Sequence, residues 1–104
     1  MPDRTPRALR LAIQEHAPHL MPDVEAHWKR AVSDTSARTP APALAAFMRL
    51  WWTQYAIARD PALDARLRDL EARAAESEDP ERSLRLLEEY SRLRHEAAES
   101  EPGE

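Results

Sequence analysis

The chain has 104 residues, one glycine and no cysteine, which disfavours disulfide frameworks, cysteine-based zinc sites and glycine-rich phosphate-binding loops. Its net charge of −4 is unevenly divided: eight basic and five acidic residues in 1–59 leave +3, whereas seven basic and fourteen acidic residues in 60–104 leave −7. Because a negatively charged half repels nucleic acid, any contact with nucleic acid is expected from the first half.

Proline marks the places where helices are expected to begin. Five prolines precede residues with helix-forming preferences, in the pairs Thr5-Pro6, Met21-Pro22, Thr39-Pro40, Asp60-Pro61 and Asp79-Pro80. Proline suits the first helical position because its φ is already helical and its missing N–H has no intrahelical partner to lose. A Thr or Asp just before it can cap the exposed amide groups. The sequence therefore predicts five helices.

The first two predicted helices, 6–16 and 22–35, are short and amphipathic. Between them, Pro18 disfavours helical geometry at the residue before it, so 17–21 is predicted to be a connection. Trp28 is the largest apolar side chain of the second helix and its expected anchor on the core.

The third predicted helix, 40–59, carries most of the aromatic rings of the chain. Large apolar side chains occupy a wide arc of it: Leu44, Phe47, Met48, Trp51, Trp52 and Tyr55. An arc of this width is typical of a helix that is covered on more than one side. We therefore expect this helix to be central, with the first two helices packed on it.

The last two predicted helices, 61–75 and 80–98, have narrow apolar stripes and many charges. Apolar residues recur at steps of three and four, at Leu63, Leu67, Leu70 and Ala74 and at Leu86, Tyr90, Leu93 and Ala97, which is coiled-coil spacing. Carboxylates precede arginines by four residues in Asp64-Arg68, Asp69-Arg73, Glu81-Arg85 and Glu88-Arg92. The short link 76–79 predicts an antiparallel hairpin that leans on the third helix or on a second copy of itself.

The adjacent pair Trp51-Trp52 leaves two main interpretations open, and stacking on nucleic-acid bases is disfavoured because only Arg49 and Arg59 are near and no sheet platform is expected. Neighbours on a helix point about 100° apart, so the two rings cannot fill the same contact. Either both lie in the core of one chain, or one of them contacts another protein or a second copy, since Trp is enriched at binding hot spots. Together with the heptad steps, the second interpretation predicts a homodimer or a protein partner. The residues expected at that interface are Trp52, Tyr55, Leu67, Leu70, Leu86, Tyr90 and Leu93.

Side chains that could support catalysis or bind a metal follow no recognisable pattern. His16 and His19 have helical spacing, but Pro18 between them should break the shared face. The serines lack the surroundings of a nucleophile, and most carboxylates lie beside arginines on exposed faces. We therefore expect no catalytic, metal-binding or cofactor-binding residues, and a protein that is not an enzyme. With no apolar run near the roughly 20 residues of a membrane span and no signal segment, we expect a cytoplasmic protein without a membrane partner.

Basic residues near the beginning of the chain leave a second function open. A positive face is what a DNA-associated regulator or an antitoxin-like protein would use. The residues expected to contact nucleic acid in that case are Arg4, Arg7, Arg10, Lys29 and Arg30. The same arginines could instead lie on a solvated surface or meet an acidic partner.

Three segments of the chain resemble a known family. Residues 8–13, the sequence VEAHWKRAV at 24–32 and the sequence ALAAFMRLWWTQYAIA at 43–58 are similar to a family of short, uncharacterised helical proteins from actinobacteria. The resemblance covers about residues 6–59 and is carried by Trp28, Trp51 and Trp52. It implies no assigned activity, although proteins of this style suggest antitoxin-like or regulatory partners.

The sequence thus predicts an all-α fold in one domain, 1–104. We expect a Trp-rich three-helix core at 6–59, a charged antiparallel hairpin at 60–98 and a disordered acidic tail at 99–104. The expected function is binding to another protein or to itself, with homodimerisation favoured.

Overall fold

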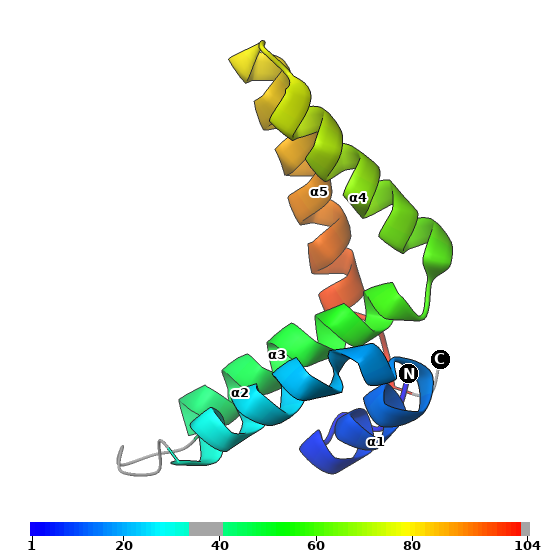
Figure 1. Ribbon diagram of the computed structural model, residues 1–104, viewed down its shortest axis with the longest axis vertical. Helices are drawn as coiled ribbons and strands as arrows, with labels where there is room; N and C mark the ends of the chain where they lie inside the picture. Colours follow the sequence, from blue (N-terminus) through cyan, green and yellow to red (C-terminus); the bar gives the residue numbers. More distant parts are fainter. Residues whose placement is uncertain (34–40, 103–104) are drawn as a thin grey trace.

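The computed structural model of the protein describes residues 1–33 and 41–102. Within these ranges the chain forms five α-helices and no strand, so the predicted all-α fold is confirmed (Figure 1). The elements are α1 (Pro6–His16), the 3-10 turn η1 (Pro18–Leu20), α2 (Met21–Ser33), α3 (Ala41–Ala58), α4 (Pro61–Glu76) and α5 (Pro80–Ala98). The second helix was expected to run on to Thr35, and the third to begin at Pro40; these positions lie outside the described residues, as do Gly103 and Glu104 of the tail.

Three of the predicted helix starts are visible with their caps. The Thr5 hydroxyl accepts a hydrogen bond from the backbone N–H of Ala8 at 3.2 Å. The Asp60 carboxylate does the same for Leu63 at 3.1 Å, and Asp79 for Glu81 at 3.0 Å. These bonds satisfy amide groups that have no partner inside the helix. At the pair Met21-Pro22, α2 begins at Met21, one residue before the expected start. The turn η1 occupies much of the expected connection and runs directly into α2.

The molecule has the outline of an L (Figure 1). One limb is the body, in which α1 and α2 pack on one side of α3. The other limb is the arm, the antiparallel hairpin of α4 and α5, which rises from the opposite side of α3. The returning end of α5 packs against α3. The predicted hairpin therefore leans on the third helix, and its far end extends away from the body.

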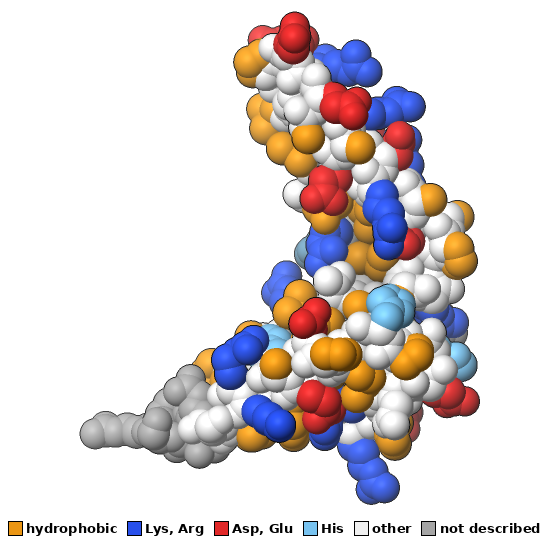
Figure 2. Space-filling view, viewed as in Figure 1, with side chains coloured by type: hydrophobic (Ala, Val, Ile, Leu, Met, Phe, Trp, Pro, Cys, Tyr) orange, Lys and Arg blue, Asp and Glu red, His pale blue; other side chains and the backbone are white. Residues whose placement is uncertain are grey.

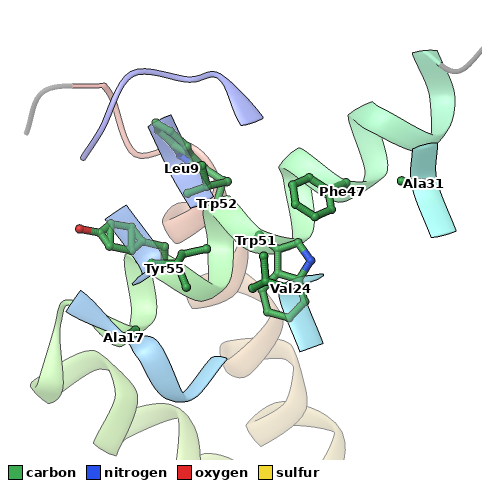
Figure 3. Close-up of a cluster of buried hydrophobic side chains, with 9 residues drawn as sticks. Leu9, Ala17, Val24, Ala31, Phe47, Trp51, Trp52 and Tyr55 are labelled. Carbon is green, nitrogen blue, oxygen red and sulfur yellow. The ribbon is translucent and has the colours of Figure 1, made fainter. Parts of the chain in front are cut away.

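The main core lies around α3, as the wide apolar arc of this helix predicted. Its fully buried side chains are Leu9 and Ile13 from α1, Val24 from α2, and Phe47 and Trp52 from α3. Figure 3 shows how these rings and branched chains interlock between the helices. Burial of large apolar side chains contributes about 1.5–3 kcal/mol each, so this cluster supplies much of the stability of the body.

A second, smaller cluster joins the arm to the body. Ala56 and Ile57 of α3 are buried against Leu67 of α4 and Ala97 of α5. Farther out, Leu70 and Ala74 are buried in the arm itself. The apolar stripes predicted for the two arm helices are therefore the seam that holds the hairpin together and fixes its base on α3.

Candidate interaction site

Both tryptophans of the adjacent pair lie inside the single chain. The exposed fraction is 6% for Trp51 and 0% for Trp52. They point to different sides of α3, Trp51 towards Val24 and Trp52 towards Leu9 (Figure 3). The first of the two interpretations of this pair is therefore the one that the structure shows.

Each buried indole N–H has its own acceptor. Trp51 Nε1 donates to Nδ1 of His27 at 2.9 Å, and Trp52 Nε1 donates to the carbonyl oxygen of Ser100 at 3.0 Å. The guanidinium of Arg4 lies over the Trp52 ring, 4.8 Å from its centroid. Residues from the two ends of the described chain therefore cover this tryptophan together, and the acidic tail predicted from residue 99 begins with a segment that is part of the packing.

The structure changes the expected interface. Four of its residues, Trp52, Tyr55, Leu67 and Leu70, are buried within one chain, so their side chains are not available to a partner. The other three, Leu86, Tyr90 and Leu93, are half-buried. The heptad spacing that suggested an interface between chains is satisfied instead by α4 packing on α5 inside one chain. The four buried side chains therefore leave a contact surface to other residues.

Exposed leucines on the arm provide such a surface. Leu84 and Leu87 of α5 are 58% and 45% exposed, and Figure 2 shows hydrophobic side chains gathered along the far part of the arm on the side of the inner angle of the L. A second set of steps on α5, of three, four, four and three residues, connects Leu84 and Leu87 with Ser91, His95 and Ala98. We call these five residues the open stripe. This spacing places them on one face of the helix, separate from the seam.

The open stripe leads into a hollow between α3 and α5, which we call the inner corner. Its main part has a volume of about 580 Å³, and its lining residues are Ala46, Arg49, Leu50 and Thr53 of α3 with Tyr90, Ser91, Arg94, His95 and Ala98 of α5. An adjoining hollow shares Arg49, His95 and Ala98. Leu50 is itself 38% exposed. The apolar surface thus continues from the arm across the corner onto the body.

The main part of the inner corner has a basic lining, whereas the adjoining hollow also contains Arg4, Glu99 and Glu101. Arg94 donates a hydrogen bond to the amide oxygen of Gln54 at 3.3 Å and lies 5.9 Å from the centroid of the Tyr90 ring. Among the described residues, neither Arg94 nor Arg49 forms an ion pair with a carboxylate. His95 is paired with Glu99 at 3.0 Å. Two arginine charges at the corner are therefore available to an acidic group from outside.

The far end of the arm has the opposite character. We define residues 76–81 as the arm tip; it holds the carboxylates Glu76, Glu78, Asp79 and Glu81 and no basic residue. None of the four forms an ion pair within the described part of the chain. Of the carboxylate-arginine pairs predicted for the arm helices, Asp64-Arg68 and Asp69-Arg73 are present, at 3.3 and 3.1 Å, whereas Arg92 pairs with Glu96 and Glu89 instead of Glu88.

The basic residues of the first half differ in their contacts. Arg10 forms a bidentate pair with Glu25, the closest N···O distance being 2.8 Å, and lies 4.8 Å from the centroid of Trp28. Arg4 covers Trp52, as described above. Arg7, Lys29 and Arg30 are exposed, and within the described ranges they form no ion pair. Of the five expected nucleic-acid contacts, Arg10 is the one that pairs with a carboxylate among the described residues, and Arg4 lies over an aromatic ring.

The polar side chains of the described residues show no convergent reactive group. No three His, Asp or Glu side chains there could bind a metal ion together. Nδ1 of His27 already accepts the hydrogen bond from Nε1 of Trp51. Ser83 donates to the carbonyl oxygen of Ala74 at 3.1 Å, across the arm. No helix in the described part of the chain combines the length and apolar character needed to cross a bilayer.

Comparisons with protein-family models, curated proteins and solved structures find no match for this chain. The resemblance to the actinobacterial family over residues 6–59 therefore stays a prediction, and the functional interpretation depends on the surface of the molecule itself.

Proposed function

We propose that this protein is a cytoplasmic, non-enzymatic interaction protein that binds another protein, or a second copy of itself, through the open stripe and the inner corner. The observation that carries the proposal is the exposure of Leu84 and Leu87 on a helix face that leads directly into the hollow beside Leu50. On a small protein, a contiguous exposed apolar surface marks a site of contact with another molecule more often than a surface that stays in contact with water.

The shape of this surface favours a helical partner. Side chains at steps of three and four on α5 form the knobs and holes that another helix fills. Arg49 and Arg94 beside this surface would pair with acidic residues that flank the apolar face of such a helix. The absence of cysteine, which fits a reducing compartment, supports the cytoplasmic location.

Two substitutions by aspartate on the open stripe test this proposal. Leu84→Asp with Leu87→Asp should abolish both self-association in sedimentation velocity and retention of partners on the immobilised protein, because charge would replace the buried contact. The matched control is Leu11→Asp with Val32→Asp, which changes two exposed apolar residues on α1 and α2, 55% and 38% exposed. Circular dichroism should show that both variants keep their helices. The proposal would be contradicted if the wild-type protein stays monomeric and if every protein that it binds when immobilised is also bound by Leu84→Asp with Leu87→Asp.

A DNA-associated regulator or antitoxin-like protein is the second candidate. Arg7, Lys29 and Arg30 support it, because their charges are exposed and unpaired among the described residues. An electrophoretic mobility shift that weakens steeply with salt, and is lost in Arg7→Ala with Arg30→Ala, would favour this candidate. No shift at low salt would remove it.

A further inference from the structure

Opposite charges lie at the two ends of the open stripe. The arm tip has four carboxylates without ion pairs in the described chain, and the inner corner has Arg49 and Arg94 without carboxylate partners there. Within one chain these groups cannot meet, because the length of α5 separates them (Figure 1). One chain therefore carries an acidic and a basic patch that would meet only through contact with a second molecule.

An antiparallel pair of α5 helices brings the two halves together. If Leu84 of each copy lies opposite Leu87 of the other, the four leucines form one apolar patch at the two-fold axis. Arg94 is seven residues after Leu87, so it lies level with the point seven residues before Leu84 of the second copy. That point is Ser77, in the arm tip. At about 1.5 Å per residue, Arg94 lies roughly 10 Å along α5 from the leucines. Ser77 lies in the turn before the first residue of α5, Pro80, so the arm tip lies just beyond the beginning of the second copy's α5 and near the level of Arg94.

The shape of the L permits this arrangement. The lower part of the open stripe, Ser91, His95 and Ala98, lines the hollow together with α3, and hydrophobic side chains gather on the inner side of the arm farther up (Figure 2). A second α5 lying along the stripe would therefore meet α3 with its arm tip. The meeting point is the corner that contains Arg49 and Leu50, where the acidic tip finds two unpaired arginines.

We propose that the occupant of the open stripe is a second copy of this chain, in a two-fold dimer in which the acidic arm tip of each copy lies against the basic inner corner of the other. The inference rests on the proposed function, since it names the partner of the same surface. Two-fold symmetry makes each contact twice, so four leucines and two pairs of charged patches are joined. Charge complementarity distinguishes this occupant from an unrelated helix, because the chain itself supplies both signs at the required spacing.

Charge reversal in two separate variants tests the arrangement. The corner variant is Arg49→Glu with Arg94→Glu, and the tip variant is Glu76→Lys with Glu78→Lys and Glu81→Lys, which changes the tip from four negative charges to a net positive charge; Asp79 is left in place because it caps α5. Each variant alone would place like charges together at both contacts, and its dimer should weaken about tenfold or more. An equimolar mixture should form a heterodimer of wild-type affinity, because each corner then meets a tip of opposite charge.

Sedimentation velocity of each variant and native mass spectrometry of the mixture give the result. The matched control is Arg7→Glu with Arg30→Glu, which has the same charge change as the corner variant on α1 and α2 and should dimerise as the wild type does. A mixture that stays monomeric, or corner and tip variants that dimerise normally, would overturn the arrangement. If Leu84→Asp with Leu87→Asp nevertheless loses a different bound protein, the proposed function stands and only this dimer is excluded.

Discussion

Replacing Trp52 with phenylalanine tests the packing around α3. The indole is fully buried, and its Nε1 donates to the carbonyl oxygen of Ser100 at 3.0 Å. Phenylalanine keeps an aromatic ring in place but removes the hydrogen bond and the second ring of the indole. The change therefore acts on the contact that joins the end of the described chain to the core.

The expected loss of stability can be estimated from two contributions. A cavity of roughly 40 Å³ at about 24 cal/mol per Å³ lowers the free energy of unfolding by ~1 kcal/mol. Loss of the hydrogen bond to Ser100 adds about 1 kcal/mol. A total of about 2 kcal/mol lowers the Tm of a domain of this size by about 10 °C.

Trp28→Phe is the matched control, because the same chemical change is made where the ring is half-buried and its N–H forms no hydrogen bond to a described residue. Its effect should stay below about 1 kcal/mol. Urea denaturation and thermal melts followed by circular dichroism measure both variants. Equal losses for Trp52→Phe and Trp28→Phe would refute the proposed contribution of the Ser100 contact.

Three further changes probe the body and the arm. His27→Ala leaves the buried N–H of Trp51 without its acceptor, so urea denaturation should show a loss of about 1–3 kcal/mol; no loss would mean that the bond contributes nothing. A double-mutant cycle of Arg10→Ala and Glu25→Ala should give a coupling energy of about 0.5–1 kcal/mol. This energy should fall with added salt, since both side chains are partly exposed. If the two substitutions have additive effects on the free energy of unfolding, the ion pair does not stabilise the protein. Leu70→Ala, within the arm seam, should cost about 2–5 kcal/mol in thermal unfolding, and a loss below ~1 kcal/mol would contradict its burial.

Local signals in the sequence were sufficient for the helices. Proline after Thr5, Asp60 and Asp79 marked three starts, because the geometry of the first helical turn depends on a few neighbouring residues. The seam of the arm and the central position of α3 also followed from apolar spacing. These features depend on periodicity within single elements.

Which apolar side chains stay exposed depends on how the elements pack, and four of the residues expected at an interface, Trp52, Tyr55, Leu67 and Leu70, are buried within one chain. Heptad spacing in α5 shows which residues can face another helix, but not whether α4 or a second molecule is that helix. The same ambiguity placed Trp52 at an interface, although Ser100, 48 residues farther along the chain, covers it. The signal that could have found the open stripe is the second set of three- and four-residue steps beginning at Leu84.

A distance measurement between copies tests the two-fold dimer most directly. The chain has no cysteine, so Arg92→Cys on the exposed flank of α5 accepts a single spin label. In the antiparallel arrangement, Arg92 of one copy lies level with Asp79 of the other. Arg92 of that second copy is thirteen residues farther along its chain. Thirteen residues at about 1.5 Å, with helix axes roughly 10 Å apart, place the two labelled positions about 22 Å from each other. Double electron–electron resonance should show this distance, and its loss in Leu84→Asp with Leu87→Asp. A signal from isolated spins alone, or labels more than about 40 Å apart, would contradict the dimer.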